Sequence, residues 1–231
     1  MASCSCSAAL FTRSRVPLKR YNLLTAAIYP KLSALPQAVS SDGEISKNAL
    51  KKISNLIEYA EKNPGRIPKI ARRLERRLVK DINRENRRGY VDISVRGFIQ
   101  LIVCCSKLLS LFTMHVFRVS HLLLHHSQEH MQVLAVLLLQ AFWKHGTVPA
   151  YLRQMDDFVG PLKCLTHCTK ADQAFQNYGV QSVALGGLEE FVRWMSRTKF
   201  ISEQLPAIIA TVLDNLQRTQ PLVHSKPQTS K

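Results

Sequence analysis

The chain has 231 residues, which is room for one domain or a repeat array of similar size, so its core needs no disulfide or metal to hold it. Hydrophobic residues make up 46% and charged ones 21%, which excludes a wholly disordered chain. The net charge is +16, and residues 1–90 carry most of it, with 19 basic and 7 acidic side chains. This end of the chain is therefore expected to meet an anionic partner.

We expect no secretory signal peptide, because no basic region followed by an apolar one comes after Met1. The longest apolar stretches, 98–112 and 131–143, are shorter than the ~20 apolar residues that span a bilayer, so we expect no transmembrane helix. The six cysteines form three close pairs without secretory context. That pattern favours a reduced, cytosolic setting.

Residues 1–41 contain no acidic side chain, five basic ones and seven serines, which is also typical of an organelle transit peptide. A plastid destination is therefore an alternative. The same segment offers another hypothesis, because Cys4 and Cys6 are followed by basic residues. S-acylation beside a basic patch supplies the two signals that stable membrane anchoring requires. The residues concerned are Arg13, Arg15, Lys19 and Arg20. Unmodified thiols are the other interpretation.

The first clear helical patterns follow a loop that ends at residue 43. Ser41 and Glu44 have the spacing of a capping box and predict a helix start. Apolar residues at three- and four-residue intervals then predict an amphipathic helix over 45–60. Asn63-Pro64-Gly65 ends it, and a second helix is expected from Pro68 to Asn86. The two helices should form a hairpin.

The rest of the chain repeats this theme, without a period-two strand pattern. Further helices are expected at 89–109, 112–125, 129–143, 152–168, 173–196 and 202–216. Paired helices at roughly 40-residue intervals predict an all-α fold, an α-solenoid of armadillo/HEAT-like helical repeats. We expect a flexible N-terminus at 1–13, the helical-repeat domain at 14–218 and a disordered tail at 219–231.

Motifs of catalysis are missing from the sequence, which contains no dinucleotide fingerprint, phosphate loop, zinc-protease motif or nucleophile elbow. We therefore expect neither an enzyme nor a cofactor. Two i,i+4 histidine pairs and a Cys-Cys-His group have helical spacings that could hold a metal, but structural roles explain them better. These residues are His121, His125, His126, His130, Cys164, His167 and Cys168. The Gly186-Gly187 pair predicts close helix packing rather than ligand binding.

The helix expected after Pro68 is the feature that indicates a binding partner. From Lys69 to Arg84 it carries seven basic residues and only two acidic ones, Glu75 and Asp81. Its basic residues are Lys69, Arg72, Arg73, Arg76, Arg77, Lys80 and Arg84. Anionic lipid attracts such residues by ~1 kcal/mol each, and nucleic acid would attract them too. No aromatic residue for base stacking occurs in this stretch before Tyr90, so membrane is favoured and no specific nucleic acid is expected. The alternatives are a merely solvated face, or a soluble helical-repeat module that uses this helix for RNA or an acidic protein partner.

Several sequence blocks resemble a known family. Ser14-Arg-Val-Pro-Leu-Lys-Arg-Tyr21 is one, and Lys62-Asn63-Pro64 followed by Arg66-Ile-Pro-Lys-Ile70 is the stronger one. Arg77-Leu-Val-Lys-Asp81 and Asn215-Leu-Gln217 match further landmarks. These blocks are similar to those of the Rolling Blackout or Eighty-five-Requiring plasma-membrane scaffold family, whose plant relatives include the Semi-Rolled Leaf proteins.

The resemblance implies a non-catalytic, peripheral plasma-membrane scaffold made of armadillo/HEAT-like helices. Family members recruit the type III phosphatidylinositol 4-kinase alpha complex to the inner leaflet through a tetratricopeptide-repeat adaptor. Animal members carry palmitoylated N-terminal cysteines and fungal ones rely on a basic patch, which implies acylation of Cys4 and Cys6 and contact of the basic residues with anionic inner-leaflet lipids. The resemblance covers the first part of the rod, whereas the adaptor binds the distal part.

The resemblance also bears on location. If residues 15–30 form the first helix of the fold, they cannot readily be a cleaved presequence. The cytoplasmic face of the plasma membrane is therefore the expected location, with cytosol or plastid as alternatives.

Overall fold

The computed structural model describes residues 19–40, 43–146, 152–167, 178–198 and 203–219. They form ten α-helices and four short 3-10 turns, and within these ranges the β-structure is a single bridge between Val39 and Ile45. The helices are α1 (Arg20–Ala27), α2 (Leu35–Ala38), α3 (Lys47–Lys62), α4 (Ile67–Asp81), α5 (Arg88–Cys104), α6 (Thr113–Leu124), α7 (Glu129–His145), α8 (Leu152–His167), α9 (Tyr178–Thr198) and α10 (Leu205–Thr219).

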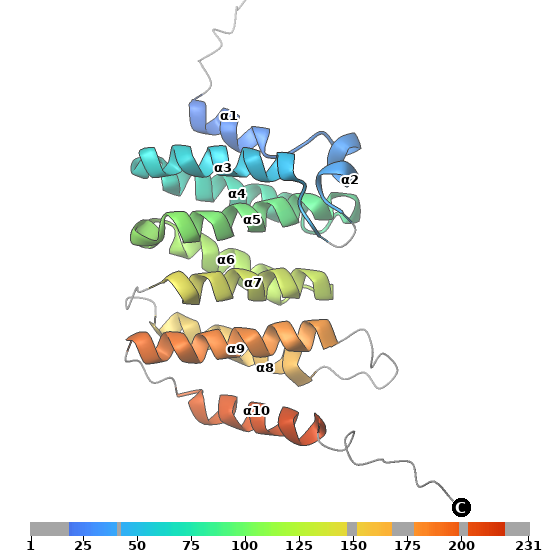
Figure 1. Cartoon of the computed structure of the whole chain (residues 1–231), viewed down its shortest axis with the longest axis vertical. Coiled ribbons are helices and arrows are strands. Elements are labelled where there is room, and N and C mark those ends of the chain that lie inside the picture. The colour runs from blue at the N-terminus through green and yellow to red at the C-terminus, as the bar shows by residue number, and fades with distance from the viewer. Residues whose placement is uncertain (1–18, 41–42, 147–151, 168–177, 199–202, 220–231) are drawn as a thin grey trace, which may run out of the picture.

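The helices stack as rungs along one axis, in two layers (Figure 1). Helices α3, α5, α7 and α9 lie one after another in the layer toward the viewer, and α4, α6 and α8 lie behind them. Each rear helix packs against the front helix that follows it in the chain, while α1 and α10 cover the two ends. This arrangement confirms the predicted all-α solenoid.

The start of α3 differs from the prediction. Ser46 is the N-cap, and its Oγ accepts the backbone N–H of Ala49 at 3.4 Å. Glu44 lies before the helix, where its N–H donates to the Oγ of Ser40. The predicted capping box is therefore wrong, because the chain turns at Gly43, with φ of +79°, and only then enters the helix at Lys47. Ser41 itself lies outside the described residues.

The end of α4 also differs from the prediction. The helix stops at Asp81, a 3-10 turn spans Glu85–Arg87, and α5 begins at Arg88. Arg84, predicted on the basic helix, therefore lies in the connection. The reason is the buried carboxylate of Asp81, which binds Arg77 on its own helix and Arg87 from the following turn.

Other helix bounds shift by a few residues. The helix expected at 89–109 is divided, because α5 ends at Cys104 and a 3-10 turn follows at Ser106–Leu111. Helix α9 begins at Tyr178, and residues 168–177 lie outside the described part of the chain. Helix α10 ends at Thr219, one residue past the predicted domain boundary. The predicted flexible N-terminus and nearly all of the predicted tail fall outside the described residues.

The core runs along the whole stack between the two layers. Its largest fully buried side chains include Phe98, Trp143, Phe191 and Trp194. The rings of Trp143 and Phe191 lie 5.2 Å apart and join α7 to α9. The two helices approach closely at Gly187, where an added Cβ would lie 2.8 Å from the Cγ1 of Val136. The close packing predicted for the glycine pair is confirmed at Gly187.

Candidate functional site

The basic residues of α4 are mostly exposed, and the core stripe of the helix explains why. Ile67, Ile70, Leu74 and Leu78 are buried, so the side chains between them project outward. The exposed basic residues are Lys69, Arg72, Arg73, Arg76 and Lys80, together with Arg84 in the following connection and Lys19 and Arg20 at the start of α1. Cys4, Cys6, Arg13 and Arg15 lie outside the described residues.

Helix α1 packs against α3 and α4 and brings its own polar side chains to the basic helix. Asn22 accepts a hydrogen bond from Nη1 of Arg73 at 2.6 Å, and the guanidinium of Arg20 lies over the ring of Tyr59. A cleft of about 380 Å³ lies between α1 and α4. Its lining, the α1–α4 cleft from here on, is Thr25, Ala26, Tyr29, Pro30, Arg73, Arg76, Arg77 and Lys80.

Arg77 is the basic residue of α4 that forms an ion pair with a buried carboxylate. Its Nε lies 2.5 Å from Oδ2 of Asp81, and its guanidinium lies over the rings of Tyr29 and Tyr90, 5.0 and 4.6 Å from their centroids. The Tyr29 hydroxyl bonds with Ser94, and burial raises the pKa of this phenol well above its usual value. Arg77 is thus held in place by contacts on three sides.

The positive charge of the α4 surface is largely uncompensated. Asp81 is buried, and Glu75 faces α6, where it pairs with His115 and lies 3.9 Å from Arg118. Among the described residues, no carboxylate lies within ion-pairing distance of the exposed basic side chains of α4. Folding therefore neutralises Arg77 but leaves the predicted basic face, Lys69, Arg72, Arg73, Arg76 and Lys80, charged.

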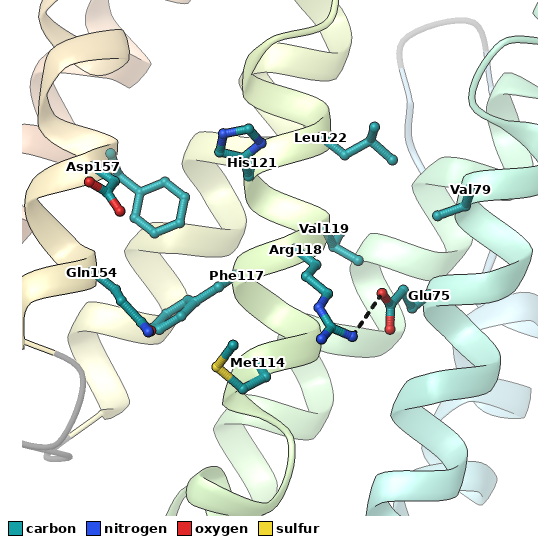
Figure 2. A pocket seen from close by; sticks show the side chains of 11 residues that line it. Glu75, Val79, Met114, Phe117, Arg118, Val119, His121, Leu122, Gln154 and Asp157 are labelled. Carbon is teal, nitrogen blue, oxygen red and sulfur yellow. Dashed lines mark ion pairs between the residues drawn. The ribbon is translucent and has the colours of Figure 1, made fainter.

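A second hollow, an apolar groove of about 590 Å³, lies on the other side of α4, between α4, α6 and α8 (Figure 2). Val79, Met114 and Leu122 are 52%, 41% and 37% exposed there, with Arg118 and Glu75 paired at its edge. Among the described residues that line the groove there is no Ser, Thr, Cys or Lys. Helix α4 thus forms one wall of a basic cleft and one wall of an apolar groove.

The histidines named above have structural contacts. His130 Nε2 lies 2.7 Å from Oδ1 of Asp92, and His126 Nδ1 accepts the N–H of Gln128. His121 and His125 stack at 4.2 Å between ring centroids. Over the ranges that the structure describes, no three His, Cys, Asp or Glu side chains gather as metal ligands. Cys168 and the side chain of His167 lie outside those ranges.

The α1–α4 cleft itself is a feature that sequence reasoning missed. The basic residues of α4 were visible as a charge run, but Asn22 and Arg73 are 51 positions apart in the chain. No local pattern indicates that α1 would lie over this helix. Also within the described part of the chain, no helix is both long and apolar enough to cross a bilayer.

Comparisons with known proteins place the chain among armadillo-repeat proteins. The family described as "EFR3, armadillo repeat" matches residues 53–231. The chain is 29% identical over 212 residues to Protein SEMI-ROLLED LEAF 2 of Oryza sativa subsp. japonica. The matched segment covers 92% of this chain and 20% of that protein. It is 25% identical over 216 residues to Protein EFR3 homolog B of Homo sapiens, covering 87% of this chain and 24% of that protein.

A nematode relative, Protein EFR3 homolog of Caenorhabditis briggsae, is 28% identical over 208 residues, which cover 86% of this chain and 23% of that protein. The chain thus spans about a fifth to a quarter of the length of these relatives. No solved structure matches it.

Proposed function

This chain belongs to the EFR3 family of armadillo-repeat proteins, and from that premise we propose that it is a peripheral scaffold on the cytoplasmic face of the plasma membrane. An armadillo-repeat domain is a non-enzymatic kind of domain, and the resemblance found in the sequence points to the same role. The scaffold would present helical-repeat surfaces to partner proteins while its basic face contacts lipid.

The observation that carries the proposal is the uncompensated basic face of α4. Lys69, Arg72, Arg76 and Lys80 are exposed on one helix, and Lys19 and Arg20 lie at the start of the helix packed beside it. Each basic residue near an anionic leaflet contributes ~1 kcal/mol, so this group is enough for measurable adsorption at physiological salt.

Adsorption by charge alone is reversible, and a covalent lipid would prolong it. Acylation of Cys4 or Cys6, assisted by Arg13 and Arg15, would supply the second signal. The cysteines precede α1, the first described helix, which packs beside the basic face of α4. An anchor there would therefore be joined through the chain to the helix beside the basic surface.

The partner we propose is the type III phosphatidylinositol 4-kinase alpha complex, bound through a tetratricopeptide-repeat adaptor. Support for this step comes from family membership alone. Because the chain matches about a fifth to a quarter of its relatives, and the family's adaptor contact lies in the distal rod, the described helices would serve as the membrane-proximal part of such an assembly.

Vesicle binding tests the proposal. The test variant replaces Lys69, Arg72, Arg76 and Lys80 with Glu, and the control variant reverses four exposed cations elsewhere, Lys52, Arg96, Lys107 and Lys144, with the same change in net charge. We expect the test variant to lose binding to phosphatidylserine vesicles and the control to keep most of it. Arg77 is not substituted, because its loss would remove an ion-pair partner of the buried Asp81 carboxylate.

Either of two results would overturn the membrane proposal. One is unchanged vesicle binding by a test variant whose helical circular dichroism matches the wild type. The other is an affinity of the wild type for mixed-sequence RNA well above that for anionic vesicles, which would support a soluble module instead.

A further inference from the structure

We propose that the α1–α4 cleft is a binding site for a phosphomonoester group carried on a polyol ring, as in a phosphorylated inositol headgroup. The proposal rests on the proposed function for the source of the ligand, a lipid of the membrane that the basic face contacts. It goes further in assigning one headgroup to one cavity, whereas adsorption by the basic face needs no cavity.

Four cations converge on the α1–α4 cleft. Arg76 and Arg77 are adjacent, and each lies three or four residues from both Arg73 and Lys80, so the four share one side of α4, and all of them line the cleft. The opposite wall is formed by Thr25 and Ala26 of α1 and by Tyr29 and Pro30 of the segment that follows it. None of the lining residues is acidic, and Arg77 is the one cation of the four that pairs with a described carboxylate, so the other three give the cleft a positive potential.

Contacts within the fold position two of these cations. Asn22 holds Arg73 through Nη1, and Asp81 holds Arg77 through Nε while two tyrosine rings flank its guanidinium. The ion pair of Arg77 uses Nε, and a guanidinium has five N–H donors, so the pair does not exhaust its capacity. Arginines fixed in this way lose less conformational entropy when an anion arrives than freely moving ones do.

The cations of the cleft favour one kind of anion, a phosphomonoester. A phosphomonoester carries about −1.5 to −2 charges at neutral pH and three acceptor oxygens, which several guanidinium forks can share. The phosphate group of a phosphodiester, such as that of phosphatidylserine, carries less negative charge. The cleft volume of about 380 Å³ lies at the lower end of the range of small-molecule pockets, about 300–1,000 Å³. The Tyr29 ring and Pro30 add an apolar wall for the face of a sugar-like ring.

The position of the cleft fits a ligand presented by a surface. Arg76 and Lys80 are exposed at its rim, while Arg77 is 31% exposed and Tyr29 extends inward to Ser94. Lys69 and Arg72, on the same helix, lie outside the lining. The chain therefore offers two pairs of exposed cations on one helix that differ in whether they line the cleft.

The test compares these two pairs. The cleft variant is Arg76→Gln with Lys80→Gln, and the control is Lys69→Gln with Arg72→Gln, so both lose two charges from α4. Binding is measured to phosphatidylcholine vesicles that contain either phosphatidylserine or phosphatidylinositol monophosphate at matched surface charge. We expect the wild type to prefer the phosphatidylinositol monophosphate vesicles by about tenfold in Kd. The cleft variant should lose that preference, and the control should keep it while binding both vesicles more weakly.

A second arm separates the lipid from a free phosphate compound. Isothermal titration with inositol trisphosphate, inorganic phosphate and glycerophosphoserine uses the same three proteins in solution. We expect inositol trisphosphate to bind the wild type and the control, and the cleft variant to bind it about tenfold more weakly. Binding of inorganic phosphate with equal affinity would mean that the polyol ring is not recognised and would overturn that part of the proposal.

The outcomes distinguish this inference from the proposed function. Equal binding of the two vesicle types by the wild type, or equal loss of preference in both variants, overturns the cleft and leaves the membrane-binding surface standing. Binding of inositol trisphosphate that depends on Arg76 and Lys80, without binding to any anionic vesicle, supports the cleft and overturns the membrane role.

Discussion

The carboxylate of Asp81 lies beneath the guanidinium of Arg77, with Oδ2 2.5 Å from Nε, and no part of its side chain is exposed. Its other oxygen is 3.1 Å from Nη1 of Arg87, which comes from the turn before α5. One buried carboxylate at the end of α4 therefore binds both Arg87 of the following connection and Arg77, which lines the α1–α4 cleft.

Replacing Asp81 with Asn should destabilise the protein by about 2–4 kcal/mol, because two partly buried arginines would lose their counter-charge. The measurement is the urea unfolding midpoint by circular dichroism. Glu58→Gln is the matched control, since Glu58 forms an exposed i,i+4 pair with Lys62 and its loss should leave the midpoint almost unchanged. Equal midpoints for the two variants would show that the Asp81 ion pairs stabilise the protein no more than the exposed Glu58–Lys62 pair does.

The protein should lose stability at high pH, because the phenol of Tyr29 is buried. Burial raises its folded-state pKa above the unfolded value of about 10, so above that pH the unfolded chain releases a proton that the folded chain keeps. The unfolded state then binds fewer protons, and this contribution to stability falls as pH rises from about 10 toward the folded pKa.

Tyr29→Phe tests this pH dependence. The variant should be about 1 kcal/mol less stable at pH 7, because the hydrogen bond with Ser94 is lost. Between pH 10 and about 11.5, however, its unfolding free energy should fall less steeply than that of the wild type. Parallel curves for the two proteins would contradict the assignment.

Much of the fold could be predicted from the sequence because each helix buries one stripe. In α3, the residues Ile53, Leu56, Ile57 and Ala60 are buried as their spacing predicted. The resemblance in the block around Asn63 was also predictive, since the family comparison confirmed the family. Periodicity works here because adjacent helices of a solenoid contact each other through those stripes.

The details of the site could not be predicted in the same way. Arg77 and Asp81 at i,i+4 have the spacing of an ordinary surface pair, yet Asp81 turns inward because Arg87 approaches from the next turn. The contact between Asn22 and Arg73 depends on how α1 packs, which no local pattern specifies. The basic face was therefore predicted as a set of charges, while the cleft required the tertiary structure.

The two adjacent glycines of α9 should respond differently to substitution. In Gly187→Ala the new Cβ would lie 2.8 Å from Cγ1 of Val136, so either the Val136 side chain or the spacing of α7 and α9 must shift, at a cost of about 1–3 kcal/mol. In Gly186→Ala the nearest atom is Nε2 of Gln140 at 3.1 Å, the end of a flexible side chain, and alanine favours the helix by up to about 1 kcal/mol. Thermal unfolding midpoints compare them, and a Gly187→Ala protein as stable as Gly186→Ala would contradict the close contact.

The proposed lipid anchor predicts where the protein lies in cells. With a C-terminal fluorescent tag, the wild type should outline the plasma membrane, and the Cys4→Ser/Cys6→Ser variant should become largely diffuse, because charge alone gives only reversible adsorption. Cys104→Ser with Cys164→Ser is the matched control, since both thiols are exposed on the folded helices and their loss should leave the rim signal intact.

Burial raises the pKa of the Cys105 thiol to about 11, which keeps it protonated and a poor nucleophile for acylation. A rim signal unchanged in the Cys4/Cys6 variant would remove acylation from the mechanism and leave the basic face as its membrane contact, whereas a wild type that is diffuse or lies in plastids would contradict the plasma-membrane location itself.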